Sequence, residues 1–177
     1  MTDLLPLLQE FYREKLTLLL RHETAARHIQ QYDFNNTYQY IINREEVQLT
    51  WLATAIRELG AAPGGTAEPE RAVSGARAVP EGTRRSRRSR SRHSDAAHAL
   101  IEEDVRETQA FVDRWRPRIA EMSNARHAKM LEVILGEALE QKRFFEQALA
   151  GRTDLLGRRA DVLLPSHGDV LPTRWIE

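Results

Sequence analysis

Apolar residues recur at intervals of three and four through four long segments of the chain, a spacing that places them on one face of a helix. The four segments cover residues 2–32, 37–59, 94–117 and 124–150. Pro117 is expected to kink or end the third helix, and Gly60 and Gly151 to stop the second and fourth. Amphipathic helices of this length bury their apolar faces against one another, so the sequence predicts an all-α four-helix bundle.

The intervening segments predict how the bundle is connected. Residues 33–37, "DFNNT", read as a turn between the first two helices, because Asp, Asn and Thr are turn and capping residues. Residues 61–93 are rich in Gly, Pro, Ala, Ser and Arg and offer little apolar surface, which predicts a flexible linker. The chain then divides into a first helical hairpin (1–60), this crossover linker, a second hairpin of the same bundle (94–151) and a C-terminal tail (152–177).

The predicted inward faces contain polar residues. In the first helix that face is Leu5, Leu8, Tyr12, Leu16, Leu19, Glu23, Ala26 and Ile29. In the other three helices the polar residues on it are Glu45, Gln48, Asp104, Thr108 and Gln141. Buried carboxylates need a cation, a proton or hydrogen-bond donors, so these positions mark the candidate functional site.

Composition excludes several classes of function. The chain has 26 basic and 26 acidic residues, so no net charge steers it towards nucleic acid or a membrane. It has no cysteine, which excludes disulfides, iron–sulfur clusters and thiolate zinc sites. The N-terminal sequence has neither a secretory signal pattern nor an uninterrupted apolar span, so we expect a cytoplasmic protein that does not bind membranes.

The two halves of the chain can be aligned with each other. "EEVQLTWLATAI" (45–56) matches "ALEQKRFFEQAL" (138–149) and pairs Gln48 with Gln141, while "HETAA" (22–26) matches "RETQA" (106–110) and pairs Glu23 with Glu107. In these residues the chain resembles the ferritin-like superfamily of ferritins, bacterioferritins and rubrerythrins. Those bundles consist of two helix pairs, in which one helix supplies a Glu and the other a Glu-x-x-His followed by bulky apolar residues.

The resemblance implies a di-metal site and an iron or manganese cofactor. Its ligand positions in this sequence are Glu23, Glu45, Gln48, Glu107 and Gln141, with Glu137 beside Ala138 as a substitute carboxylate. Asp104 competes with Glu107, because it is better centred on the apolar face. The departures from the pattern are that both histidines are glutamines and that the second bridging glutamate is Ala138.

Two interpretations stay open at this point. In the first, the bundle is non-catalytic, its metal site has decayed into a layer of amides around residual glutamates, and it serves as a scaffold or interaction protein. Glu45 is then expected to have a raised pKa. In the second, it is a metal-binding oxidase or iron-handling protein with fewer carboxylates. His22 is expected to face away from the site in both cases, while Glu23 and Glu45 are expected to meet at one level.

Two segments outside the helices suggest partners. The run "RRSRRSRSRH" (84–93) is typical of nucleic-acid contacts or of a solvated insert, and it has no aromatic residue for base stacking. Its arginines are Arg84, Arg85, Arg87, Arg88, Arg90 and Arg92. The tail ends in Trp175 and Ile176, which are expected to pack on the bundle, on a second copy in a homo-oligomer or on another protein.

Overall fold

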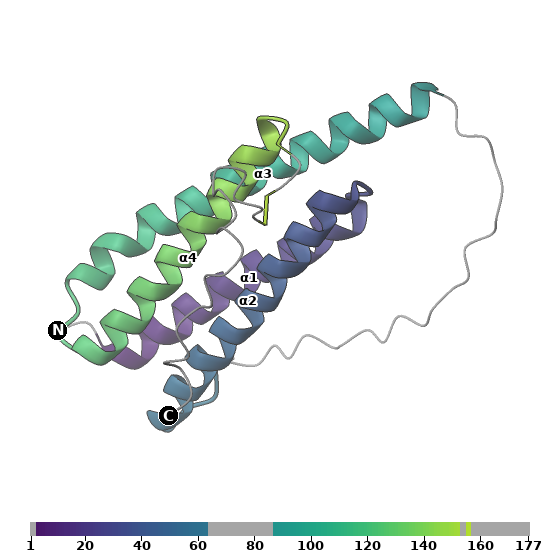
Figure 1. Cartoon of the computed structure of the whole chain (residues 1–177). Helices are drawn as coiled ribbons and strands as arrows, with labels where there is room; N and C mark the ends of the chain where they lie inside the picture. Colours follow the sequence, from purple (N-terminus) through teal and green to yellow (C-terminus); the bar gives the residue numbers. More distant parts are fainter. Residues whose placement is uncertain (1–2, 64–86, 153–154, 157–177) are drawn as a thin grey trace, which may run out of the picture.

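The computed structural model describes residues 3–63, 87–152 and 155–156. It contains four helices, α1 (Leu4–His28), α2 (Tyr32–Glu58), α3 (Arg87–Ala120) and α4 (Ala125–Leu149), and no strand occurs in these ranges. The predicted all-α class and the number of helices are therefore confirmed. Figure 1 shows the helices side by side, with α1 and α2 as one pair, α3 and α4 as the other, and the N-terminal end of α3 projecting past its neighbours.

Each helix packs against two others, and neighbouring helices run antiparallel. Contacts join α1 to α2 and α3, and α4 to the same two helices. Between α1 and α3, Glu10 pairs with Arg118 and Arg21 with Glu103, so the order of partners is reversed along the two helices. Between α2 and α4 the same reversal appears in the pairs Tyr40–Phe144 and Glu58–Arg126. Helices α2 and α3 consequently lie diagonally and point the same way (Figure 1).

The turn between α1 and α2 was predicted in the wrong place. The two helices are joined by residues 29–31, and the segment 33–37 forms the first turns of α2. Asn35 does act as a capping residue, but for α1: its Nδ2 donates to the carbonyl oxygens of Ala26 at 2.7 Å and Ile29 at 3.3 Å. The end of α1 thus obtains its hydrogen bonds from inside the next helix.

The second hairpin differs from the prediction at its start. Helix α3 begins at Arg87, so residues 87–93 belong to a helix and not to the linker. It also continues past Pro117 to Ala120. The start of α4 is as predicted, because Asn124 precedes it and accepts a hydrogen bond from the backbone N–H of His127 at 3.1 Å. Gly60 and Gly151 follow α2 and α4 with φ angles of 81° and 79°, a conformation that favours glycine.

The core is built on alternating steps of three and four residues. In α1 the buried series is Leu8, Phe11, Lys15, Leu18, His22, Ala25 and Ile29, and α4 contributes Leu131, Ile134, Ala138, Gln141, Phe145 and Ala148. This is the spacing of helices packed at a shallow angle in bundles. The face predicted for α1 was rotated: Leu8, Leu19, Ala26 and Ile29 are buried, whereas Leu5, Tyr12, Leu16 and Glu23 are only partly buried.

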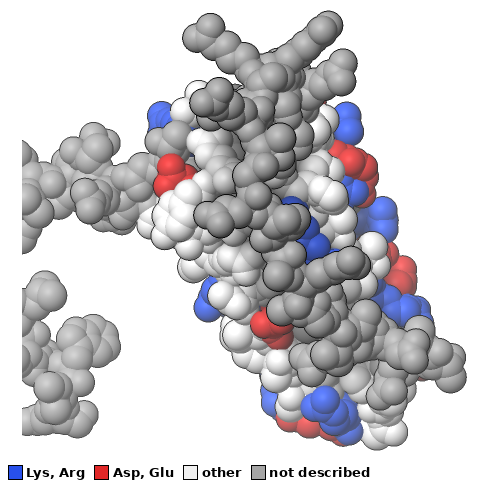
Figure 2. All heavy atoms as spheres, turned by 90° about the vertical axis from the view of Figure 1, so that its right-hand side faces the viewer, with Lys and Arg blue, Asp and Glu red and all other residues white. Residues whose placement is uncertain are grey.

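The surface carries charges of both signs. On the side in view in Figure 2, Lys and Arg side chains alternate with Asp and Glu along the edge of the molecule. No helix among the described residues is long and apolar enough to cross a membrane. Trp175, Ile176, Arg84 and Arg85 lie outside the described ranges, as does most of the predicted linker and tail.

Candidate functional site

Glu45 lies at the centre of a fully buried ionic triad in the middle of the bundle. Its Oε1 accepts a hydrogen bond from Nζ of Lys15 at 2.8 Å, and its Oε2 lies 2.8 Å from Nδ1 of His22. All three side chains have no exposed surface. Both carboxylate oxygens are therefore engaged by cationic or N–H groups of the chain's own first helix.

The triad reverses the expectation for the pKa of Glu45. Burial alone raises the pKa, but charge and hydrogen bonding from His22 and Lys15 outweigh it, and the net shift is to a value below 4.5. Glu45 is thus held as a carboxylate. The prediction of a raised pKa for Glu45 is wrong, because it assumed that amide groups surround the carboxylate and did not include the ammonium of Lys15.

His22 faces the interior, contrary to the prediction. Its ring lies between aromatic neighbours, 6.1 Å from the Tyr38 ring and 5.3 Å from the Phe145 ring between centroids. While Nδ1 contacts Glu45, Nε2 is buried without a hydrogen-bond partner. The imidazole therefore acts as an orienting group for the carboxylate, with its second nitrogen turned into an aromatic environment.

A second buried carboxylate, Asp104, lies on α3. It accepts a short hydrogen bond from the Tyr38 hydroxyl and a charged one from Nε of Arg21 at 2.6 Å. Arg21 also bonds Glu103, which lies nearer the surface. Burial, together with the Asp104 charge, raises the pKa of Tyr38, so the phenol stays protonated and donates.

Glu137 forms a third carboxylate cluster at the rim of the interior. Its oxygens bond the guanidinium of Arg44 and Nε2 of Gln48, the latter at 2.5 Å. Glu137 and Gln48, two of the predicted site residues, are thus brought together. Gln48 donates its amide to Glu137, whereas the donors to Glu45 are Lys15 and His22.

Several buried polar atoms have no hydrogen-bond partner within the part of the chain that the structure describes. Besides Nε2 of His22 these include Oε1 of Gln48, the hydroxyl of Thr108 and both amide atoms of Gln141. Gln141 lies on α4 between Glu137 and Phe145, one helical turn from each, so it is placed between the rim cluster and the His22 ring. The interior therefore retains a polar layer to which all four helices contribute.

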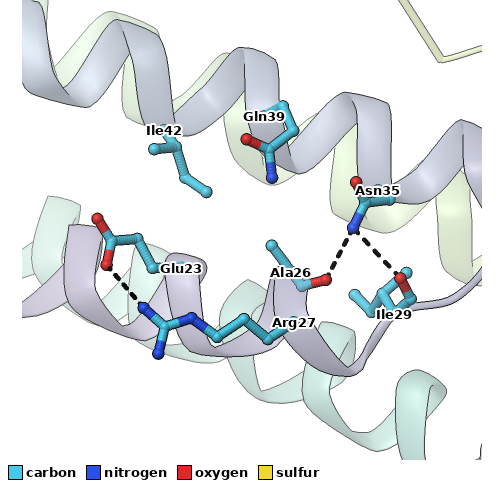
Figure 3. Close-up of a pocket in the computed structure, with 7 residues that line it drawn as sticks. All are labelled: Glu23, Ala26, Arg27, Ile29, Asn35, Gln39 and Ile42. Carbon is cyan, nitrogen blue, oxygen red and sulfur yellow. Dashed lines mark hydrogen bonds and ion pairs between the residues drawn. The ribbon is translucent and has the colours of Figure 1, made fainter. Parts of the chain in front are cut away.

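Glu23 and Glu107 are not brought to this layer. Glu23 is 33% exposed, pairs with Arg27 on its own helix and lines a surface pocket of about 550 Å³ between α1 and α2 (Figure 3). Glu107 is exposed on the outer side of α3, where it lines a small hollow with Glu14 and Arg114. Of the two competing residues on α3, Asp104 faces the interior and Glu107 does not.

The donors near Glu45 fit a di-metal centre poorly. An ammonium 2.8 Å from one carboxylate oxygen occupies the place of a cation and would repel a metal ion there. The amides of Gln48 and Gln141 are weak ligands, and Ala138 supplies none. Within the described residues, no group of three or more His, Asp or Glu side chains is arranged to hold a metal ion.

Lys15 and His22 are site residues that were not predicted from the sequence. Both lie on the series 8, 11, 15, 18, 22, 25, 29, whose alternating steps of four and three would have placed them inward. Lys15 and Glu45 are also equally far along the chain from residue 30, the middle of the observed turn. The sequence therefore contained the spacing that indicates both residues, but the turn predicted at 33–37 placed Glu45 at the level of Glu23 instead.

Comparison with known proteins gives no relative from which a role could be transferred. No protein-family model, curated protein or solved structure matches the chain. The function must therefore be inferred from the interior and from the surface of the bundle.

Proposed function

We propose that this chain is a ferritin-like helical bundle without catalytic activity, in which side chains replace the metal ions, and that it acts as a scaffold or interaction protein. The observation that carries the proposal is the occupation of both Glu45 oxygens by Lys15 and His22. In this arrangement the ammonium supplies the positive charge that a bridging metal would supply. The glutamate remains ionised, and the bundle needs no cofactor to compensate it.

The arrangement of the helices supports the ferritin-like assignment. Such a fold consists of two antiparallel hairpins joined by a crossover along the length of the bundle. The antiparallel neighbours and the parallel diagonal of α2 and α3 agree with it. Helices of 25–27 residues are about 40 Å long, and residues 59–86, when extended, can reach a little more than twice that distance.

The interior supports a structural role more than a chemical one. The rings of Tyr38 and Phe145 pack beside His22 of the triad, and the three carboxylates are each engaged by donors of the chain. Large apolar side chains are instead exposed on the outside of α2 and α4, among them Val47, Trp51 and Val133. Exposed apolar residues that gather on one side of a bundle are typical of protein-binding surfaces.

Metal analysis tests the proposal. The full chain is expressed in medium supplemented with iron and, separately, manganese, and the purified protein is measured by inductively coupled plasma mass spectrometry. We expect neither metal at stoichiometric amounts. The variant Lys15→Gln, which removes the ammonium but keeps a polar side chain, serves as a matched comparison because it frees one Glu45 oxygen.

The competing role is that of an iron- or manganese-dependent oxidase or iron-handling protein. It predicts one or two ions per chain in the unmodified protein and their loss in Glu45→Ala. That result would overturn the proposed function. Metal that binds only to Lys15→Gln would instead support it, because it would show that the lysine fills the position of the ion.

A further inference from the structure

The outer surface between α2 and α4 differs from the other sides of the bundle. We call it the α2–α4 face and define it by Tyr40, Val47 and Trp51 on α2 and Met130, Val133 and Phe144 on α4. Four of these six side chains, Tyr40, Val47, Trp51 and Val133, are between 38% and 42% exposed although they lie in the middle of long helices. The rings of Tyr40 and Phe144 lie edge to face, 6.1 Å apart between centroids.

Charged pairs divide this face into apolar sections. Arg44 pairs with Glu137 between the two aromatic residues and Val47, and Arg126 pairs with Glu58 at the far end at 3.2 Å. Beside Trp51, a hollow of about 240 Å³ is lined by Ala55, His127 and Met130. The face thus offers a row of apolar positions separated by ion pairs, over about 27 Å from Tyr40 to Glu58.

The opposite surface, between α1 and α3, is lined by charged pairs. Glu10 binds Arg118 at 2.6 Å and Glu14 binds Arg114 at 2.8 Å. The Arg118 guanidinium also lies 4.0 Å from the centre of the Trp115 ring and covers it. The asymmetry places the surface available for binding apolar chain on the α2–α4 side.

The C-terminal segment starts next to this face. Helix α4 ends beside the beginning of α2, because Phe145 packs on Tyr38 with ring centroids 5.2 Å apart. After Gly151 the chain turns back, and Leu155 is buried in the apolar core at 6% exposure. The described part of the chain therefore ends near the Tyr40 end of the face, with Leu155 packed in the core just before residue 157.

The length and the residue composition of segment 157–177 suit the α2–α4 face. Twenty-one residues reach about 70 Å when extended, more than twice the length of the face. Asp-Val-Leu occurs twice, at 161–163 and 169–171, followed by Trp175 and Ile176, with arginines at 158, 159 and 174. Apolar groups spaced between charges of both signs match a surface on which apolar sections alternate with ion pairs.

We propose that residues 157–177 dock in cis along the α2–α4 face and cover its exposed aromatic and aliphatic side chains. This inference deepens the proposed interaction role and rests on it, because it names the chain segment that the exposed apolar face binds. The binding of a second copy of the chain or of another protein to the same face in place of the tail is the alternative that the experiment must separate.

Disulfide cross-linking in the full chain tests the docking, and the absence of cysteine makes every introduced pair unambiguous. The test variant is Thr54→Cys with Thr173→Cys, and the control is Thr17→Cys with Thr173→Cys. Thr54 on α2 and Thr17 on α1 are both exposed, and each hydroxyl bonds the carbonyl four residues earlier, so the two substitutions disturb the helices equally. Circular dichroism and the melting temperature verify that both variants fold.

We expect the Thr54 pair to form a disulfide within one chain at least about tenfold faster than the Thr17 pair, because docking raises the local thiol concentration. Adding Trp51→Glu is expected to remove this advantage, whereas Leu20→Glu, at an exposed leucine on α1, is expected to keep it. Equal rates for the two pairs would overturn the proposal, and so would cross-links that form mainly between chains.

The two proposals fail in different experiments. Stoichiometric metal in the unmodified protein would contradict the substitution of ions by Lys15 while leaving the cross-linking result intact. Equal cross-linking rates in a metal-free protein would remove the docking of the tail and leave the interior as described.

Discussion

The pairing of Lys15 with Glu45 is the residue-scale feature on which the interior depends. Two opposite charges without any exposed surface lose their hydration, and only their mutual attraction and hydrogen bonds compensate that loss. The contact with His22 engages the second oxygen of the carboxylate. Removing Glu45 leaves the buried Lys15 ammonium without its counterion, and removing Lys15 leaves the buried Glu45 carboxylate with the His22 contact alone among the described residues.

A double-mutant cycle is expected to show this dependence. Lys15→Met and Glu45→Leu should each lower the free energy of unfolding by about 3–5 kcal/mol, because each removes the opposite charge from a buried ionic side chain. The double variant Lys15→Met/Glu45→Leu should lose much less and come close to the unmodified chain. Chemical denaturation monitored by circular dichroism measures all four proteins, and losses that simply add would contradict the pairing.

The lowered pKa of Glu45 predicts the direction of the pH dependence. The native carboxylate binds protons less readily than the unfolded one, so its contribution to stability is present above the unfolded value near 4.5 and is lost as the pH falls through the native pKa. Denaturation between pH 6 and 3 should therefore show a steeper loss for the unmodified chain than for Lys15→Met/Glu45→Leu. Parallel curves would show that Glu45 is not held ionised.

Part of the site could be predicted from single residues and part could not. Glu45, Gln48 and Gln141 stood at polar positions on otherwise apolar faces, and all three are buried. Lys15 was not predicted to be buried, and a lysine is rarely buried in proteins. The predicted inward face of α1 differs from the observed one by a rotation of one residue, which replaces Lys15 by Leu16 and His22 by Glu23. The series in steps of four and three that passes through Lys15 and His22 distinguishes the two faces, but the turn predicted at 33–37 favoured the face that pairs Glu23 with Glu45.

At the scale of helices, the connection between α1 and α2 determines which residues meet. Three residues join these helices, and Asn35 fixes the junction by bonding two carbonyl groups at the end of α1. A turn was predicted at 33–37 because "DFNNT" has the composition of a turn. Asn35 in fact lies in the first turns of α2 and donates hydrogen bonds to the end of α1. The fourth helix was predicted more closely, since Asn124 and Gly151 lie at its ends as ordinary capping residues.

Asn35→Ala is expected to destabilise the first hairpin. The substitution leaves the carbonyl oxygens of Ala26 and Ile29 without this donor and should lower the free energy of unfolding by about 1 kcal/mol. The adjacent Asn36 is exposed, and Asn36→Ala provides a control with the same loss of an amide. Thermal and urea denaturation of the pair measure the difference, and equal stabilities would refute the capping role.

At the scale of the whole molecule, the number of helices and their antiparallel neighbours could be predicted because long amphipathic segments leave few packing solutions. The difference between the α1–α3 and α2–α4 surfaces could not be predicted from the sequence, because it depends on which exposed residues of separate helices become neighbours. Arg118 covers Trp115 only because α3 runs antiparallel beside α1. No local pattern around either residue indicates that contact.

The two halves of the chain match in sequence but differ in where the partners of their buried carboxylates come from. The partners of Glu45, namely Lys15 and His22, belong to the same hairpin as Glu45 itself. Asp104 and Glu137 of the second hairpin instead depend on Tyr38, Arg21, Arg44 and Gln48 of the first. Two copies of the second half would therefore lack these counterions, so the two halves are not interchangeable.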